Sequence, residues 1–267
     1  MIITQYFDLR FNPFRKEVPS NEMFAGSDWQ ELYQRLQFLE KSRGIGLIVG
    51  APGIGKSTAL RKYLQSLNTS LYHTQYLALS TLTPLDFFRG MAMGLGEEPA
   101  AKKIKLIGQI QRAIETYYYD RKLTPVIVLD EMHMASTQLF EELRLVLNFK
   151  MDSENPFILI LAAQPMIRSK LNLNIHYPLR QRILVKCYMS GLSKTEIANY
   201  IDSRLELAGS KDQIFTRSAI DAVHAVSNGL PRVVNSIATN CLLYACEKQV
   251  REVDEEIVYQ AHNELNI

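Results

Sequence analysis

Short apolar runs alternate with longer segments of helical periodicity through the first 190 residues of the chain. The apolar runs have the length of strands, and they lie at residues 45–50, 74–80, 125–130, 156–164 and 182–188. Between them, apolar residues recur at spacings of three and four, as Leu139, Leu143 and Leu147 do. This alternation predicts a parallel sheet flanked by helices, and the continuous apolar character of the second, third and fourth runs predicts strands covered on both faces.

The pattern becomes purely helical after about residue 190. Apolar residues fall on one helical face in three segments, at residues 193–209, 216–229 and 254–265. Thr216 and Asp254 have the side chains of helix N-caps, and Gly209 and Gly229 are typical of helix ends. We therefore expect an α/β domain over residues 1–190 and a small all-helical domain over residues 191–267.

The composition is that of a soluble globular chain in a reducing compartment. The 267 residues are 47% hydrophobic and the formal net charge is only +2, so nucleic-acid binding would require a local basic patch. Cys187, Cys241 and Cys246 have no metal-ligand or CxxC spacing, which indicates apolar packing residues. Charged residues interrupt the apolar N-terminus, and no uncharged apolar run approaches about 18 residues. We expect a cytoplasmic protein with neither a signal peptide nor a membrane-spanning segment.

The stretch GAPGIGKS, residues 50–57, matches the phosphate-binding pattern GxxxxGK[ST] in full. It follows an apolar run and opens a helical pattern, a context in which glycines let backbone N–H groups converge on phosphate oxygens. We assign Lys56 to the β- and γ-phosphates and Ser57 to Mg²⁺. The residues predicted to bind the nucleotide here are Gly50, Ala51, Pro52, Gly53, Ile54, Gly55, Lys56, Ser57 and Thr58. Neither an NKxD guanine pattern nor an LSGGQ signature is present, which favours ATP.

The run VIVLDE, residues 126–131, supplies the second acidic element of a P-loop site. Its apolar residues place Asp130 and Glu131 at the carboxyl end of a strand, where open α/β sheets bind ligands. We expect Asp130 to orient the Mg²⁺ shell and Glu131 to polarise the attacking water. Because both elements are present, hydrolysis is favoured over a nucleotide-controlled scaffold without turnover. His133 is expected to be a packing or capping residue.

These elements occur in the order Walker A, Walker B, another buried strand, a pair of arginines and a helical lid, an order that resembles the AAA+ superfamily of ATPases. The resemblance implies a sensor-1 strand at residues 157–164 that ends in Gln164, where many members have Asn or Thr. The alternative is an ordinary core strand with a solvent-facing Gln. It also implies an arginine finger at Arg182, or else Arg180, that reaches the γ-phosphate of a neighbouring subunit. A finger requires a homo-oligomer, as a ring or a filament, and the alternative is a solvated basic turn.

The segment NGLPRVVNSIATNCLL, residues 228–243, resembles the sensor-2 motif of the AAA+ lid. Gly229 would end one helix, Pro231 fits the first turn of the next, and Arg232 would project toward the nucleotide. The alternative for Arg232 is a surface role at a helix terminus.

A narrower likeness, to the ExeA-type ATPases, extends from end to end. It rests on F.L...PF ahead of the Walker A motif, LDEMH at the Walker B motif, and LRQRI and GLPR in the same order. The likeness makes Pro13 and Phe14 candidates for an apolar segment beside the adenine, with a hydrophobic anchor for the N-terminus as the alternative.

The ExeA-type ATPases serve two kinds of biology. In type II secretion the module is followed by a transmembrane helix and a peptidoglycan-binding domain, whereas this sequence stops after its lid. Others are short helpers encoded with DDE transposases, which would assemble on duplex DNA with ATP, select target sites and contact or stimulate the transposase. The length favours the helper role. The alternative is an ATP-dependent assembly factor for a secretion-type protein machine without DNA contact.

Direct sequence signs of DNA binding are few. Lys102, Lys103 and Lys105 form a small basic cluster at the start of a predicted helix, and Arg168 and Lys170 follow the fourth apolar run. These side chains would contact phosphates without reading base sequence. A solvated helix face is the alternative.

Overall fold

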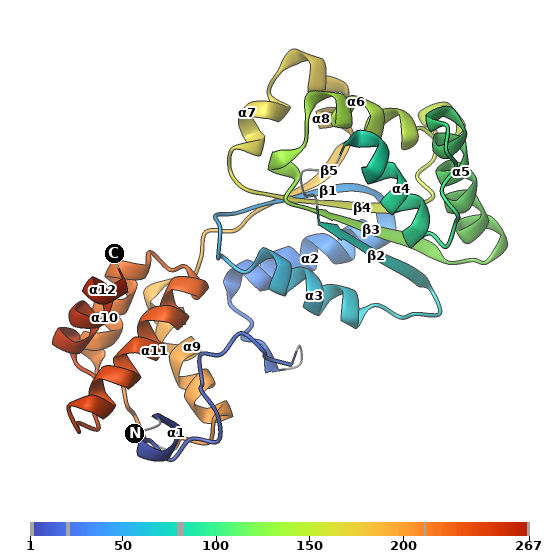
Figure 1. Cartoon of the computed structure of the whole chain (residues 1–267). Helices are drawn as coiled ribbons and strands as arrows, with labels where there is room; N and C mark the ends of the chain where they lie inside the picture. The colour runs from blue at the N-terminus through green and yellow to red at the C-terminus, as the bar shows by residue number, and fades with distance from the viewer. Residues whose placement is uncertain (1–2, 20–21, 79–82, 211, 266–267) are drawn as a thin grey trace. The chain divides into compact units, whose positions relative to one another are not determined.

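The computed structural model describes residues 3–19, 22–78, 83–210 and 212–265 (Figure 1). Contacts divide the chain into two compact units. We call Glu31–Gly50 with Lys56–Met189 the sheet unit, and Met1–Gln30 with Ala51–Gly55 and Ser190–Ile267 the helical unit.

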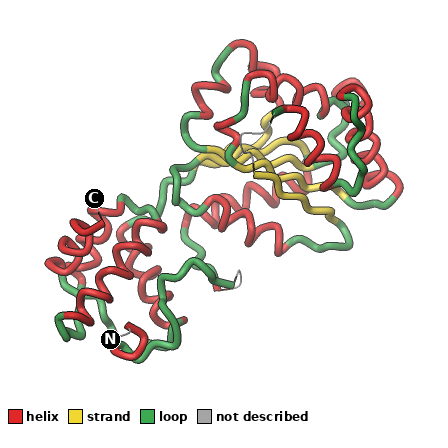
Figure 2. Tube along the Cα trace, in the orientation of Figure 1, coloured by secondary structure: helices red, strands yellow, loops and turns green. Residues whose placement is uncertain are grey.

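The sheet unit is built on five parallel strands (Figure 2). They are β1 (Gly44–Val49), β2 (Tyr72–Ala78), β3 (Thr124–Asp130), β4 (Ile158–Ala163) and β5 (Ile183–Tyr188). Their order across the sheet is β2-β3-β4-β1-β5, and every neighbouring pair is parallel. The predicted parallel sheet is therefore confirmed. Residues 79–80 of the second expected strand lie outside the described residues.

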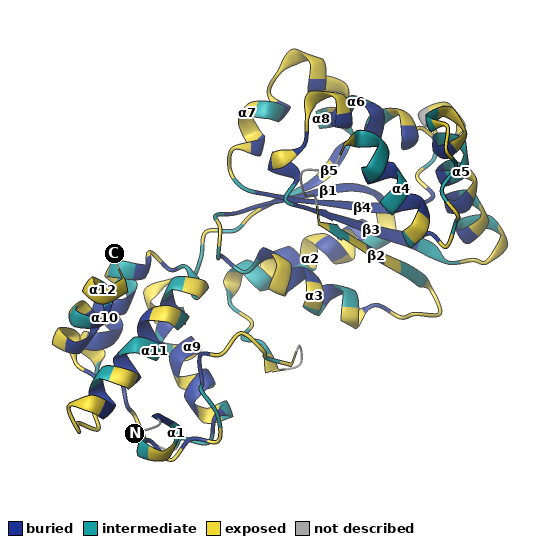
Figure 3. Ribbon diagram, in the orientation of Figure 1, coloured by how far each residue is buried: buried dark blue, intermediate teal, exposed yellow. Residues whose placement is uncertain are grey.

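Strand burial follows position in the sheet (Figure 3). Every residue of β1 and β4 is buried, as are all residues of β3 after Thr124. The prediction that the second run is covered on both faces is wrong, because β2 is an edge strand in which only Gln75 is buried. β1, in contrast, lies between two other strands and is buried along its whole length. Its two glycines interrupt the apolar run, so the sequence did not predict this burial.

Helices cover both faces of this sheet. Figure 1 shows α2 and α3 on one face and α4, α5 and α6 on the other. Their bounds are Ser27–Ser42 for α2, Lys56–Ser66 for α3, Pro84–Gly94 for α4, Lys103–Glu115 for α5, Thr137–Val146 for α6, Ile167–Leu171 for α7 and Tyr177–Arg182 for α8. A π-helical turn, Thr116–Asp120, extends α5, and short 3₁₀ turns lie at Met132–Met134, Lys150–Asp152 and Asn174–His176.

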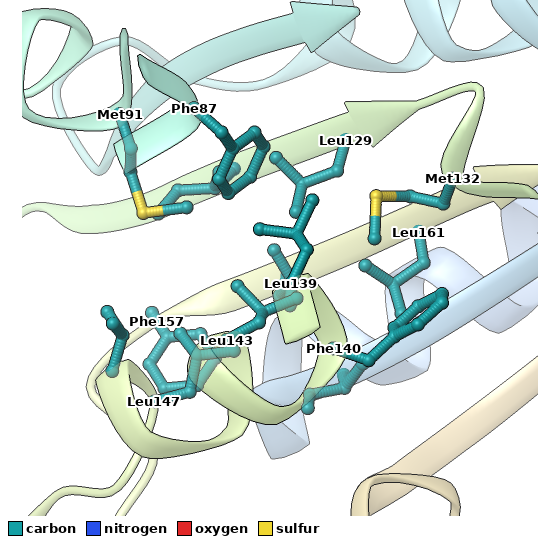
Figure 4. Packing of buried hydrophobic residues seen from close by; sticks show 14 of the residues in the cluster. Phe87, Met91, Leu129, Met132, Leu139, Phe140, Leu143, Leu147, Phe157 and Leu161 are labelled. Atoms are coloured by element: carbon teal, nitrogen blue, oxygen red, sulfur yellow. The ribbon is translucent and has the colours of Figure 1, made fainter. Parts of the chain in front are cut away.

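The core of the sheet unit lies between β3, β4 and the helices above them. In Figure 4, Leu139 and Leu143 of α6 point toward Leu129 of β3, and Phe87 and Met91 of α4 close the same cluster. Burying each such side chain contributes about 1.5–3 kcal/mol. This packing positions β3 and its neighbours, and the two predicted nucleotide-binding motifs follow the carboxyl ends of β1 and β3.

The helical unit has the all-helical character that the sequence predicts. Its helices are α1 (Ile3–Tyr6), α9 (Lys194–Leu207), α10 (Arg217–Ser227), α11 (Pro231–Glu247) and α12 (Glu255–Leu265). The Thr216 hydroxyl accepts the Ala219 N–H at 3.2 Å, and Asp254 Oδ1 accepts the Ile257 N–H at 3.0 Å. Both side chains therefore act as the expected N-caps.

The N-terminal segment packs into the core of the helical unit. Phe14 is 4% exposed and meets Phe215 edge to face, with ring centroids 6.1 Å apart. The Arg10 N–H donates to the Ala208 carbonyl oxygen at 2.8 Å. Residues 1–30 thus group with the helical unit, whereas the sequence-based boundaries assigned them to the α/β domain. No helix in the described ranges is both long and apolar enough to cross a membrane.

Candidate nucleotide-binding site

The loop between β1 and α3 has the backbone that its glycines predict. Gly53 and Gly55 have φ values of +79° and +104°, in the left-handed region that L side chains rarely adopt. The loop begins where the Gly50 N–H donates to the Ala163 carbonyl oxygen at 3.1 Å, and it ends where Lys56 opens α3. A glycine turn with left-handed backbone that leads directly into a helix N-terminus is a sequence of elements that suits a phosphate.

Lys56 and Ser57 follow the loop directly. The Lys56 side chain is buried, and its Nζ donates to the Gly50 carbonyl oxygen at 2.9 Å. The Ser57 Oγ donates to Asp130 Oδ2 at 2.7 Å. The structure therefore brings together the two motifs that the sequence places 73 residues apart.

Asp130 is nearly saturated with hydrogen bonds. It is 1% exposed at the end of β3. Its Oδ2 also accepts the Tyr76 hydroxyl at 2.7 Å, and its Oδ1 accepts the Glu131 N–H at 2.8 Å. Burial and the bond to Asp130 raise the pKa of Tyr76 well above its usual range. A carboxylate beside a hydroxyl is a donor set that Mg²⁺ accepts when waters and phosphate oxygens complete its shell.

Tyr76 is the site residue that the sequence analysis missed. It lies on β2, which pairs with β3 so that Ala78 is level with Asp130. The alternation of a strand then turns Tyr76 to the same face as Ala78. Only the neighbouring position of β2 and β3 reveals this contact, and the sequence does not show strand order.

Glu131 lies at the turn after β3 with φ 58° and ψ 30°, in the left-handed region. Its Oε2 is 3.3 Å from Nδ1 of His133, which is 8% exposed. The same Nδ1 accepts the Gln164 N–H at 3.5 Å. The Lys170 ammonium donates to the carbonyl oxygens of His133 and Ala135 at 2.5 and 2.9 Å. His133 is thus a packing residue, as expected, and it also contacts the carboxylate assigned to water activation.

Gln164 follows β4, the strand between β1 and β3. Its backbone is therefore held between the P-loop strand and the strand that ends in Asp130. The side chain is half-buried. Its sensor-1 role remains a proposal.

Arg180 and Arg182 lie at the end of α8, directly before β5. Arg182 Nη1 donates to the Arg144 carbonyl oxygen at 3.1 Å, and Arg180 Nη1 donates to Asn172 Oδ1 at 2.8 Å. Both side chains are half-buried. Each guanidinium therefore has a hydrogen-bond partner within this chain, and the finger role remains a proposal.

In the helical unit, Arg232 lies in the first turn of α11, and Pro231 occupies the first helical position as predicted. The Arg232 N–H donates to the Gly53 carbonyl oxygen at 3.2 Å, so this helix end contacts the glycine loop. Pro13 and Phe14 are buried. The contact of Phe14 with Phe215 makes it an anchor of the N-terminus, and an adenine contact remains a proposal.

Comparison with known proteins agrees with this geometry. A profile of the AAA domain family matches residues 39–171, which include the glycine loop, Asp130 and Gln164. The chain therefore contains an AAA domain. It is 27% identical over 245 residues to General secretion pathway protein A of Aeromonas hydrophila, a match that covers 91% of this chain. The chain spans only 44% of the length of that relative.

Two solved structures place this AAA+ ATPase among related folds. Cdc6p of Pyrobaculum aerophilum superposes with a TM-score of 0.70 and 15% identity, over 94% of this chain and 70% of the other. The Drosophila ORC structure bound to DNA also gives a TM-score of 0.70, with 17% identity, over 99% of this chain and 66% of the other. At these identities the likeness concerns the fold. It confirms the predicted AAA+ architecture of a parallel sheet with flanking helices and a helical C-terminal part.

Proposed function

We propose that this AAA+ ATPase hydrolyses ATP with Mg²⁺, forms a homo-oligomer with ATP between subunits, and acts on duplex DNA as a transposition helper. In that role it would select target DNA and recruit or stimulate a DDE transposase. The observation that carries the catalytic part is the hydrogen bond between Ser57 and Asp130, which joins the phosphate loop to the acidic strand end. The cellular role rests on the likeness of the sequence to ExeA-type helper ATPases.

The catalytic roles follow from the chemistry of each group. Lys56 would neutralise the β- and γ-phosphates, and Ser57 and Asp130 would hold Mg²⁺. Bound Mg²⁺ supplies positive charge to the β- and γ-phosphate oxygens. Glu131, with 39% of its side chain exposed, would orient and polarise the attacking water.

The remaining predicted residues would act on the same nucleotide from other elements. Gln164 would sense the γ-phosphate at the end of β4, and Arg182, or else Arg180, would complete the site of a neighbouring subunit. Arg232 would contact the phosphates from the lid, and Pro13 and Phe14 would lie beside the adenine. A site completed in this way makes hydrolysis depend on assembly.

The exposed side of α5 supports contact with DNA. Lys102, Lys105 and Arg112 are exposed, and Lys105 and Arg112 line an open groove of about 540 Å³ together with Gln109 and one carboxylate, that of Glu97. Residues seven apart lie on one helix face, so the two cations point the same way. Lys103, in contrast, forms an ion pair with Glu142. Exposed cations of this kind bind phosphates in a salt-dependent manner.

Two other basic residues have roles inside their own unit. Lys170 donates to two backbone carbonyls, and Arg168 lies over the Tyr188 ring, 4.1 Å from its centroid. We therefore assign the DNA contacts to α5 in preference to these residues.

An ATP-dependent assembly factor of a secretion-type machine is the second candidate. The identity to General secretion pathway protein A, at 27%, favours it. In that case ATP turnover would respond to a protein partner and not to DNA.

ATP turnover with and without long duplex DNA, at low and moderate salt, tests the proposal. We expect marked stimulation that fades as salt rises, because phosphate contacts release counterions. Replacing both Lys105 and Arg112 by Gln should weaken the stimulation while leaving basal turnover unchanged. Lys248→Gln, an exposed lysine of the helical unit, serves as the charge control. Basal turnover indifferent to DNA would contradict the proposal and favour the secretion-type candidate.

A further inference from the structure

The Nδ1 atom of His133 has two neighbours that compete for it. One is Oε2 of Glu131 at 3.3 Å, and the other is the backbone N–H of Gln164 at 3.5 Å. A carboxylate only accepts hydrogen bonds, while a backbone N–H only donates. In a neutral imidazole, Nδ1 can therefore satisfy either the carboxylate, when it carries the hydrogen, or the N–H, when it does not.

We propose that His133 is a positioning residue that orients the Glu131 carboxylate for water activation and links that orientation to the end of β4. The inference rests on the proposed ATP hydrolysis and on the role of Glu131 in it. When Nδ1 donates to Glu131, the carboxylate is fixed. In the structure Nδ1 accepts the Gln164 N–H, so its 3.3 Å approach to Oε2 is a contact that becomes a hydrogen bond when the hydrogen is carried by Nδ1.

The imidazole of His133 is buried, and hydrogen bonds hold the backbone that carries it. The side chain is 8% exposed, within the 3₁₀ turn Met132–Met134. The Met134 N–H donates to the Glu131 carbonyl oxygen at 2.9 Å, which closes the turn. The Lys170 ammonium then binds the His133 and Ala135 carbonyls from α7. A buried side chain on a backbone held in this way has few alternative positions.

Glu131 requires such support. Its side chain is 39% exposed, so it can reach a water, but exposure leaves a carboxylate free to rotate. Within the described part of the chain, His133 is the side chain seen to contact this carboxylate. The left-handed backbone of Glu131 sets the direction of the side chain, and His133 limits its rotation.

The proposal predicts a loss of turnover without a loss of ATP affinity. The groups assigned to ATP affinity, Lys56 and Ser57, bond to Gly50 and Asp130, so nucleotide binding should change by less than about 2-fold. A lost hydrogen bond to a charged group should lower kcat by roughly 10- to 100-fold. The loss should be confined to the step in which Glu131 acts.

The experiment compares His133→Leu, His133→Asn and His133→Gln by phosphate release and by titration with a fluorescent ATP analogue. The Asn amide can place an N–H near the position of Nδ1, whereas the longer Gln amide reaches toward Nε2. We expect Asn to keep kcat within about 3-fold of wild type and Leu and Gln to lose it, all with unchanged ATP affinity. In a Glu131→Gln background, His133→Leu should cause no further loss, because the group that it positions is already altered.

Thermal unfolding of each variant shows whether the fold is intact, and the contrast of Asn with Gln decides the matter if Leu does not fold. Three results would each overturn the positioning role. They are an equal loss of kcat in His133→Asn and His133→Gln, a wild-type kcat in His133→Leu, and a further loss from His133→Leu in the Glu131→Gln background. If Glu131→Gln alone turns over at the wild-type rate, the assignment of Glu131 in the proposed function is what has failed. If Glu131→Gln turns over ATP slowly while His133→Leu turns it over at the wild-type rate, only the inference about His133 is overturned.

Discussion

The Lys56 ammonium lies 2.9 Å from the Gly50 carbonyl oxygen, so the lysine of the phosphate-binding motif donates a hydrogen bond to the first residue of the same motif. The side chain is 6% exposed, and a buried ammonium needs acceptors near it. The contact thus fixes the ammonium beside the Gly50 carbonyl oxygen before any phosphate is bound.

Lys56→Ala should remove ATP binding, with affinity falling at least about 100-fold, because the main cation facing the β- and γ-phosphates is lost. Titration with a fluorescent ATP analogue measures the change. Arg61→Ala, an exposed residue of the same helix α3, is the matched control and should bind ATP normally. Wild-type affinity in Lys56→Ala would refute the assignment of this loop to phosphate.

Glu131→Gln should bind ATP and turn it over about 10²- to 10⁴-fold more slowly, since an amide cannot take the proton of the attacking water. Slow turnover should also trap the ATP-bound assembly, which sedimentation or light scattering would detect. The substitution removes charge without changing the size of the side chain, so the fold should be unaffected. Unimpaired hydrolysis would assign water activation to another residue.

Arg182→Ala should cut turnover while leaving ATP binding to the monomer intact, because a finger acts on the nucleotide of a neighbouring subunit. Mixing Arg182→Ala with Lys56→Ala subunits provides a sharper measurement. A Lys56→Ala subunit lacks ATP but keeps its finger, so mixed assemblies should regain part of the activity that each variant lacks. If Arg180→Ala alone shows this behaviour, Arg180 is the finger, and no complementation in either mixture would contradict action between subunits.

The parts of the fold that the sequence predicts are those fixed by local pattern. The apolar runs at β3 and β4 correspond to buried strands, and the glycines at 53 and 55 correspond to left-handed backbone. Each of these features depends on residues close together in the chain, where composition and backbone sterics act directly. The N-caps of α10 and α12 belong to the same class.

The features that sequence reasoning missed depend on which strands and segments become neighbours. The bond of Tyr76 to Asp130 arises from the pairing of β2 with β3, and the exposure of β2 arises from its place at the edge. The contact of His133 with Gln164 requires β3 and β4 to end side by side. Long-range pairing leaves no periodic signal in one sequence, so these contacts needed the structure.

Gly53→Ala should weaken ATP binding by about 10-fold or more, because two penalties coincide at this position. An alanine at φ +79° costs roughly 1–2 kcal/mol, and its Cβ would lie 2.9 Å from Cβ of Arg232. Gly108→Ala in α5 is the control, since a Cβ there meets nothing within 4 Å. That change should stabilise the chain by about 0.5–1 kcal/mol and leave ATP affinity unchanged. Normal affinity in Gly53→Ala would show that the left-handed turn is not needed for binding.

Glu196 gives the helical unit a pH-dependent stability. Burial alone would raise its pKa, but the N–H of Ser27 at 2.5 Å and the N–H and hydroxyl of Ser193 at 2.9 and 2.8 Å bind the carboxylate and lower its pKa to about 2. The pKa in the unfolded chain is about 4.3, so the unfolded state takes up the proton first as pH falls. The stabilisation by the charged form is therefore complete above about pH 5 and is lost as pH falls toward 2.

Glu196→Gln should consequently lower the free energy of unfolding at pH 7 by about 1 kcal/mol, a value reduced for the partial exposure of the carboxylate to solvent. At pH 3 the difference from wild type should shrink, because the wild-type protein has by then lost part of the same stabilisation. Urea unfolding at pH 7, 5 and 3 measures both effects, and Glu252→Gln, an exposed residue, controls for the loss of one negative charge. If Glu196→Gln kept the full pH dependence of the wild type, the acid sensitivity would belong to other carboxylates, and the capping box at α9 would contribute to stability without a measurable charge effect.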